Sequence, residues 1–291
     1  MLTPYTNIKT KEDVIPLLED NTFVLSLCEN LSFLMNRSIS PNNNEYISCP
    51  RTYAPILGLY VKIYKFWKEC LNVYKRGEIG IYIAYGRILY EAYIKMLHLM
   101  YNGTEALNEF RLISYKNRIS AYKKTNNSSE GIDLVRNIKF LEDLQADGFT
   151  INDLKYAHPR TFKSIQEIAE KTYTKEEKDI LYTLIYGLSS DAIHSDWGEL
   201  RQIHLNDIGD GMMMPNIDEI TYNHYRIILP MADIVSHAIQ LFIPFINETK
   251  EIIIEGNSFV TTAEEIRRVI CLVFEHVADE YENNPDVFLL K

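Results

Sequence analysis

The sequence predicts an all-α protein built as a single helical bundle. Apolar residues recur at the spacing of amphipathic helices through most of the 291 residues. One segment, 251–256, has the apolar run of a β-strand, but a lone strand has no partner to pair with. No internal repeat of solenoid period is visible. We therefore expect helices packed around a shared core, with extra helices at the N- and C-terminal ends.

The first half of the chain is expected to form five helices separated by clear breaks. A loop is predicted at 36–51, which contains two prolines and three consecutive asparagines. Gly77 and Gly80 separate the second helix from the third, and Asn102-Gly103 ends the third. The predicted helices cover residues 11–35, 53–76, 81–101, 105–124 and 132–146.

The second half contains two capping boxes, in which a threonine and a glutamate three residues later satisfy the first backbone N–H groups of a helix. Thr174 with Glu177 and Thr262 with Glu265 have this spacing. The predicted elements are a helical turn at 150–156, a short helix ending near 171, helices at 175–194, 227–246 and 262–281, and a loop at 208–215.

Composition and charge exclude several classes of protein. Acidic residues outnumber basic ones by 40 to 30, so a globally basic nucleic-acid-binding surface is absent. The four cysteines form no C-x-x-C pair, which excludes a zinc ribbon and indicates reduced thiols in the cytoplasm. The N-terminus has no apolar segment of the kind found in secretory signals.

The most apolar stretch, 227–246, is long enough to cross a bilayer. It contains Asp233, His237 and Gln240, however, and a charged group at the centre of a bilayer costs about 2.5–3.5 kcal/mol. We therefore expect a buried core helix and a cytoplasmic protein without a membrane partner.

A polar line crosses the otherwise apolar helix predicted at 81–101. Arg87, Glu91 and His98 are four and seven residues apart, which places them within about 40° on one helix face. Polar groups in such surroundings are costly unless they are paired. Two interpretations remain: an Arg–Glu pair that orients the helix, or a guanidinium held by Glu91 for a phosphate or carboxylate.

The next helix carries a local excess of positive charge. Residues 111–124 include five basic side chains and no acidic one. Arg111, Tyr115, Arg118 and Tyr122 share one face, and interleaved cations and rings suit a single strand of nucleic acid. The alternative is a solvated face whose tyrosines help to cover the core.

The densest cluster of polar residues lies at 184–207, and three chemistries are conceivable there. Metal binding by Asp191, His194 and His204 lacks a known ligand spacing, and no G-x-S-x-G elbow supports a serine nucleophile. The third is acid–base catalysis by His194 on a phosphodiester without a metal or other cofactor. The alternative is a histidine that anchors a helix end through hydrogen bonds.

Four segments in order resemble a known family. They are RILYEAYIKMLHL (87–99), RLISYKNRISAYKK (111–124), RTFKSIQEIAEK (160–171) and DILYTLIYGLSSDAIHS (179–195). This order is similar to a bacterial helical family known only as a domain of unknown function, family 5677, over about residues 55–205. That family resembles the HEPN-like superfamily of helical bundles, many of which are dimeric, metal-independent ribonucleases in toxin–antitoxin and anti-phage systems.

The resemblance implies three parts: an N-terminal helix and loop at 1–50, an HEPN-like core at 51–205, and a helical extension at 206–291 packed on that core. The positions that match the motifs of the family are Arg87, Glu91, Lys163, Ser189, His194 and Ser195. The usual HEPN motif, an arginine followed four to six residues later by a histidine, is absent. Arg87 and His194 would therefore have to meet from different helices.

The resemblance also implies a function. His194 would act as general acid and base, Arg87 would stabilise the phosphorane, and Glu91 would orient Arg87. RNA would lie along the 111–124 face, with Lys163, Ser189 and Ser195 as further contacts, in a homodimer with two sites. Two alternatives remain: a non-catalytic binding or sensor module, and a subunit of a defence complex whose C-terminal helix joins a protein encoded by a neighbouring gene.

Overall fold

The architecture comes from a computed structural model in which part of the chain is described. The described residues are 5–19, 21–41, 46–125, 139–156, 167, 197, 200–209, 211–216, 224–249 and 257–283. The predicted helix at 175–194 and the candidate strand at 251–256 lie outside them.

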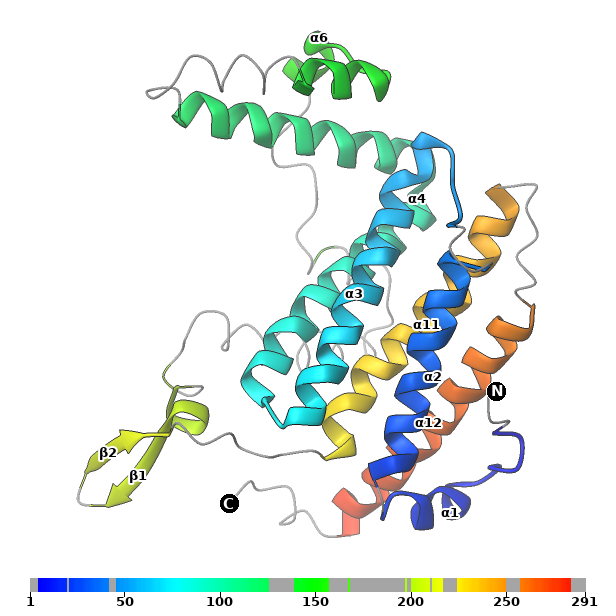
Figure 1. The fold of residues 1–291 in the computed structure, drawn as a ribbon, viewed down its shortest axis with the longest axis vertical. Helices are drawn as coiled ribbons and strands as arrows, with labels where there is room; N and C mark the ends of the chain where they lie inside the picture. Colours follow the sequence, from blue (N-terminus) through cyan, green and yellow to red (C-terminus); the bar gives the residue numbers. More distant parts are fainter. Residues whose placement is uncertain are drawn as a thin grey trace.

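The described part is a bundle of long helices, which confirms the all-α prediction (Figure 1). Its elements are the short α1 (Lys11–Val14), α2 (Asn21–Ile39), α3 (Ala54–Arg76), α4 (Ile79–Thr125), the short α6 (Ile151–Tyr156), α11 (Tyr225–Thr249) and α12 (Asn257–Asn283). Helices α3 and α4 form an antiparallel hairpin, and α11 contacts α2, α3, α4 and α12.

The ends of α3 follow directly from its sequence. Pro55 occupies the first turn, where its missing N–H would have had no intrahelical partner. Gly77 ends the helix with φ 79°, a left-handed conformation that costs glycine little, and its N–H donates to Tyr74 and Val73 carbonyls. Because α4 begins at Ile79, the reversal between α3 and α4 is very short.

Helix α4 changes direction at Gly103, where the backbone leaves helical geometry with φ 63° and ψ −147°. This is the break predicted at Asn102-Gly103. The part of α4 beyond it extends away from the bundle as an arm (Figure 1). A small second core forms against this arm. Tyr115 of the arm packs there with Phe140 and Leu144, from a helix that includes residues 139–146, and with Leu154 of α6.

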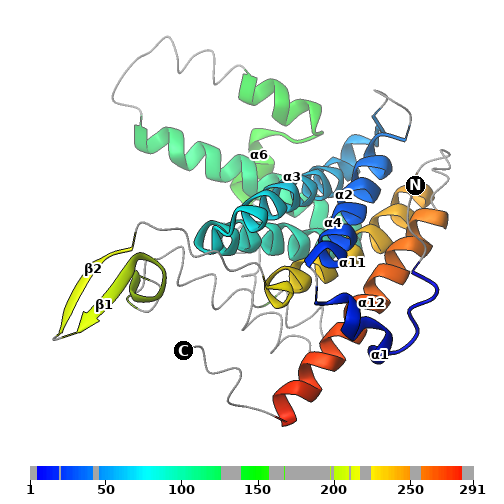
Figure 2. The same ribbon diagram turned by 60° about the horizontal axis from the view of Figure 1, so that its bottom comes forward.

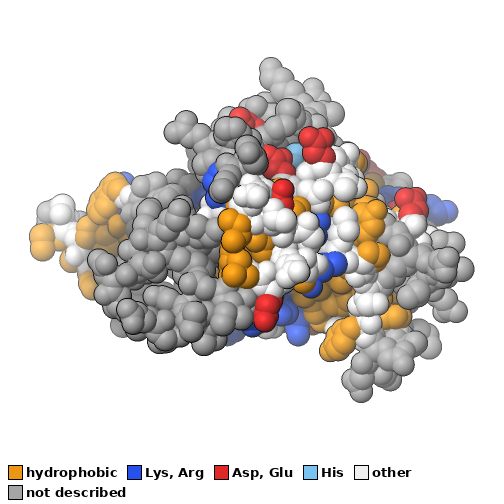
Figure 3. Space-filling view, turned by 90° about the horizontal axis from the view of Figure 1, so that it is seen from above, with side chains coloured by type: hydrophobic (Ala, Val, Ile, Leu, Met, Phe, Trp, Pro, Cys, Tyr) orange, Lys and Arg blue, Asp and Glu red, His pale blue; other side chains and the backbone are white. Residues whose placement is uncertain are grey.

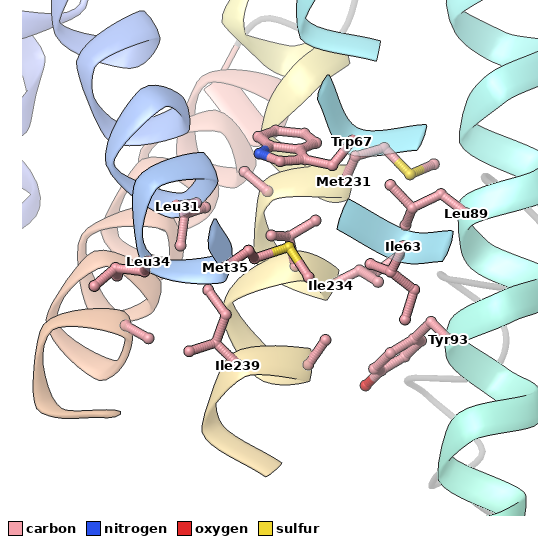
Figure 4. Packing of buried hydrophobic residues seen from close by; sticks show 14 of the residues in the cluster. Leu31, Leu34, Met35, Ile63, Trp67, Leu89, Tyr93, Met231, Ile234 and Ile239 are labelled. Carbon is pink, nitrogen blue, oxygen red and sulfur yellow. The ribbon is translucent and has the colours of Figure 1, made fainter. Parts of the chain in front are cut away.

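One large hydrophobic core joins α2, α3, α4, α11 and α12. Leu31 and Met35 of α2, Trp67 of α3 and Ile234 of α11 are fully buried in it (Figure 4). Tyr60 of α3 also stacks on Phe242 of α11 with ring centroids 3.8 Å apart. The core draws on residues from all three predicted parts of the chain, and the boundaries at 50 and 205 stay a prediction.

Helix α11 is long and apolar enough to cross a membrane by length and composition alone. In its most apolar stretch 61% is buried inside the bundle, which agrees with the prediction of a core helix. The absence of a membrane partner and the cytoplasmic location stay predictions.

Several predicted boundaries were wrong in part. The last helix begins at Asn257, so Thr262 lies inside it and does not cap it. The helix expected at 11–35 is interrupted after Val14 by a 3-10 turn, Ile15–Leu17, that holds Pro16, because proline cannot donate the hydrogen bond that a helix interior needs. The chain resumes as α2, which continues to Ile39, into the predicted loop.

The segment 208–215, expected to be a loop, belongs to a β-hairpin. Strands β1 (Leu205–Gly209) and β2 (Met212–Pro215) pair antiparallel after a π-helical turn, Leu200–His204. Gly209 and Gly211 have φ of 88° and 75°, which a tight reversal needs and which other residues rarely adopt. The hairpin projects from the bundle (Figure 2), and hydrophobic side chains gather on its outer end (Figure 3).

Candidate functional site

Helix α4 presents a line of three charged side chains, Arg87, Glu91 and Lys95, at successive intervals of four residues. Arg87 Nε lies 3.5 Å from Glu91 Oε1, and Lys95 Nζ lies 3.6 Å from Glu91 Oε2. Only 12% of the Arg87 side chain is exposed, whereas Glu91 and Lys95 are each about one-third exposed. The predicted pairing of Arg87 with Glu91 across one helical turn is therefore present.

The three side chains of this line together carry one net positive charge, because one carboxylate lies beside two cations. A guanidinium presents several N–H donors in a planar fork, and one of them, Nε of Arg87, faces Glu91 Oε1. The screening of Arg87 from water strengthens its attraction for an anion. The line is therefore suited to hold a phosphate or a carboxylate.

His98, the third polar residue of the predicted line, has a local structural role. It is 8% exposed, and its Nδ1 lies 3.2 Å from Asn102 Nδ2. Asn102 also donates to the His98 carbonyl at 2.8 Å. These contacts lie in the last turn before Gly103, where the helix has to be held as it changes direction.

Arg111 and Tyr115 of the predicted basic face converge on a single carboxylate, Asp147. The Tyr115 hydroxyl donates to Asp147 Oδ2, Arg111 Nη1 lies 3.8 Å from Oδ1, and Arg51 Nε donates to Oδ1. The Arg111 guanidinium also lies over the ring of Phe149, at 5.0 Å from its centroid. These two side chains thus hold the arm together, and their role in binding RNA stays a prediction.

The same contacts shift the pKa values of this cluster. Burial opposes the ionisation of Asp147, but hydrogen bonds from Tyr115 and Arg51 outweigh it and lower its pKa. Burial and the neighbouring Asp147 together raise the pKa of Tyr115 to about 12. Asp147 is therefore a carboxylate and Tyr115 a neutral donor at neutral pH. The sequence marks Asp147 only as the end of a helix, because its partners are distant along the chain.

The other predicted site residues are not part of the described geometry. The backbone of Arg118 and Tyr122 continues α4, while their side chains lie outside the described part of the chain. Lys163, Ser189, His194 and Ser195 lie outside it entirely. Within the described residues, no group of three or more His, Cys, Asp and Glu side chains could hold a metal ion.

A basic surface that the sequence interpretation missed lies on α3. Lys62, Lys65 and Lys68, here called the lysine stripe, follow one another at intervals of three residues and are all exposed. Lys62 Nζ lies 5.8 Å from the centroid of the Phe66 ring, and Lys68 Nζ lies 5.6 Å from that of Tyr64. The regular spacing of lysines in an acidic chain is the sequence signal that could have revealed it.

Comparison with known proteins adds a family to this geometry. The profile of a family described as of unknown function, DUF5677, matches residues 53–212, which is more than half of the chain. The match begins just before α3 and ends within the β-hairpin, so it includes the line on α4 and the lysine stripe. No curated protein and no solved structure matches the chain.

Proposed function

We propose that this chain, which belongs to the DUF5677 family, binds RNA at the charged line on α4 and cleaves it without a metal ion. The observation that carries the proposal is the screened guanidinium of Arg87, held by Glu91 beside a second cation, Lys95. The reaction itself is taken from the HEPN-like resemblance, which assigns catalysis to Arg87, Glu91 and His194.

In the proposed reaction, charge develops on the oxygens around phosphorus. His194 accepts the proton of a ribose 2′-hydroxyl, whose oxygen forms a bond to phosphorus while the bond from phosphorus to the 5′ oxygen breaks. His194 then gives this proton to the leaving 5′ oxygen, so the products are a 2′,3′-cyclic phosphate and a free 5′-hydroxyl, and atoms and charge balance. Arg87 stabilises the negative charge of the phosphorane, and Glu91 keeps the guanidinium in place for it.

An RNA cleavage assay tests this proposal. Wild type, Arg87→Ala and His194→Ala are incubated with a defined single-stranded RNA, with and without EDTA. We expect cleavage that survives EDTA and falls at least about 100-fold in both variants, the usual scale for one transition-state donor or one general base. Arg76→Ala is the control. Arg76 is the last residue of α3 and pairs with Glu78 instead of belonging to the charged line, so this variant should retain full activity.

Two results would contradict the proposal: a folded wild type that leaves the RNA intact, or cleavage that EDTA abolishes. Circular dichroism of each variant separates lost activity from lost folding.

A second function, a non-catalytic module that binds anions, is favoured by the position of His98. His98 lies two helical turns from Glu91 on α4 and contacts Asn102, so it is not beside the charged line of Arg87, Glu91 and Lys95. In this second function the charged line binds an anionic group without transferring a proton. Binding of a 2′-O-methylated RNA, which cannot be cleaved by this route, would weaken about tenfold in Arg87→Ala and stay unchanged in His194→Ala.

The HEPN-like resemblance also implies the setting. We expect a cytoplasmic homodimer that acts in phage defence or as the toxin of a toxin–antitoxin pair, with a partner protein from a neighbouring gene as the alternative. Light scattering of the purified chain would test the dimer directly.

A further inference from the structure

We propose that the outer surface of α3 holds a single strand of RNA, with the lysine stripe contacting phosphates and the rings of Phe66 and Tyr85 contacting bases. This inference rests on the proposed function in taking RNA as the polyanion. The residues belong to a different helix from the one that the sequence predicts to bind RNA.

The first argument is the distribution of charge. Helix α3 carries five basic residues and one acidic residue, Glu69, in a chain whose net charge is −10. Two of its cations are already neutralised: Lys75 lies 2.6 Å from Glu29, and Arg76 lies 2.6 Å from Glu78. Among the described residues, no carboxylate forms an ion pair with the lysine stripe. The stripe therefore retains its full charge for an external anion.

The second argument is the spacing of the stripe. Residues three apart in a helix are separated by about 4.5 Å along the axis and by about 60° around it. The ammonium groups of Lys62, Lys65 and Lys68 therefore spread over the outer face of α3 instead of stacking in one place. A row of separate cations suits a row of phosphates better than it suits one small anion.

The third argument is the presence of aromatic rings beside the cations. Phe66 of α3 and Tyr85 of α4 are half-buried and meet edge to face, with centroids 5.8 Å apart and planes at 73°. Tyr64 is held by α2, where Asn36 donates to its hydroxyl at 2.8 Å. Fixed, partly exposed rings beside cations are the arrangement that binds single strands, because bases stack on rings while cations take the phosphates.

The fourth argument is the position of the stripe relative to Arg87. Because α3 and α4 run antiparallel, the contact of Phe66 with Tyr85 sets their alignment. Arg87, two residues after Tyr85, then lies at the height of Tyr64, two residues before Phe66. This height falls between Lys62 and Lys65, so the stripe and the charged line lie at the same level along the α3–α4 hairpin.

The test measures binding separately from cleavage. Fluorescence anisotropy gives the Kd of a labelled, 2′-O-methylated single-stranded RNA for the full chain at several salt concentrations. The variant Lys62→Gln/Lys65→Gln is compared with Lys75→Gln/Arg76→Gln, which removes the same charge from the same helix where it is already paired. Circular dichroism and thermal unfolding confirm that each variant is folded.

We expect the stripe variant to bind at least tenfold more weakly than wild type at low salt, and the control within threefold. Two lost phosphate contacts should also reduce the slope of log Kd against log salt by about 1.4. Phe66→Leu should weaken binding without changing that slope, because a stacked base releases no counterions.

Equal affinities of the stripe variant and the control, or no binding by wild type at low salt, would overturn the inference. The two proposals fail separately. A wild type that cleaves ordinary RNA, with binding independent of Lys62 and Lys65, refutes the lysine stripe alone. A wild type that binds through the stripe but cleaves nothing refutes the ribonuclease alone.

Discussion

At the scale of single residues, Asp147 connects the start of α3 to the arm. Its side chain is 11% exposed, and its carboxylate accepts hydrogen bonds from Arg51 before α3 and from Tyr115 on the arm. Burying a carboxylate is costly unless charged and hydroxyl donors replace the water that it loses. The geometry of the arm relative to the start of α3 therefore depends on the charge of this side chain.

We expect Asp147→Asn to lower the free energy of unfolding by about 1–3 kcal/mol at pH 7, since the amide cannot pair with Arg51 as a carboxylate does. The pKa of Asp147 is lowered in the folded chain, so its contribution is present above the ordinary pKa of about 3.8 and is lost as the pH falls through the lowered value. Urea unfolding at several pH values between 7 and 3 should show the gap between variant and wild type narrowing as the pH falls.

Glu142→Gln is the matched control for this experiment, because it removes an exposed negative charge from the helix that leads to Asp147. It should change the free energy of unfolding by less than about 0.5 kcal/mol at any of these pH values. A gap for Asp147→Asn that stays constant down to pH 3 would show that the charge is not the source of the stabilisation.

At the scale of elements, α4 and α11 are held side by side by contacts that advance together along both helices. The Tyr82 hydroxyl donates to the Ile227 carbonyl at 2.8 Å, and further on Tyr93 lies 2.5 Å from His237 Nδ1. Both positions increase together, so the two helices run parallel. Between these contacts Gly86 faces the side chain of Met231.

Gly86 should tolerate a large side chain poorly because Met231 packs directly against it. A Cβ there would lie 2.9 Å from Met231 Cε, the flexible end of that side chain, which can move for one methyl group, whereas a larger side chain would push the helices apart. We expect Gly86→Leu to lower the free energy of unfolding by about 1–3 kcal/mol, the usual cost of overpacking. Gly58→Leu on α3 is the matched control, because nothing lies within 4 Å of its added Cβ.

The control should stabilise the chain by up to about 1 kcal/mol, since leucine favours a helix more than glycine does. Thermal and urea unfolding of the two variants give the comparison. If both substitutions shift stability in the same direction and by the same amount, α11 does not approach α4 as closely as the structure indicates.

At this scale the sequence could predict the features that depend on residues close together along the chain. Gly103 ends one helical run and begins another, and Arg87 meets Glu91, because both features depend on residues within one or two turns. The roles of Arg111 and Tyr115 could not be predicted, because Asp147 lies more than 30 residues away and no periodicity relates them. The β-hairpin was missed for another reason: its glycine turn is visible, but its strands have few of the residues that favour strands.

At the scale of the whole molecule, the core does not coincide with the region that defines the family. The family profile begins at residue 53, whereas α2, α11 and α12 lie outside it and supply much of the buried surface around α3 and α4. The N-terminal segment is also tied to the last helix, since Arg268 donates to the carbonyls of Ile8 and Tyr5. The full chain is therefore expected to unfold as one unit.

A fragment restricted to residues 53–212 should consequently fail to fold cooperatively. Removing α2 and α11 would expose Trp67, Tyr60 and Tyr93, which are at most 1% exposed in the full chain. Burial of apolar surface on this scale is what offsets the conformational entropy lost on folding, and the fragment would lack it. We expect the fragment to bind a hydrophobic dye and to melt without a sharp transition, while the full chain gives one transition by circular dichroism and by tryptophan fluorescence. A fragment that unfolds sharply near the Tm of the full chain would show instead that the matched region is an independent domain, and that the helices at both ends were added to a core already complete.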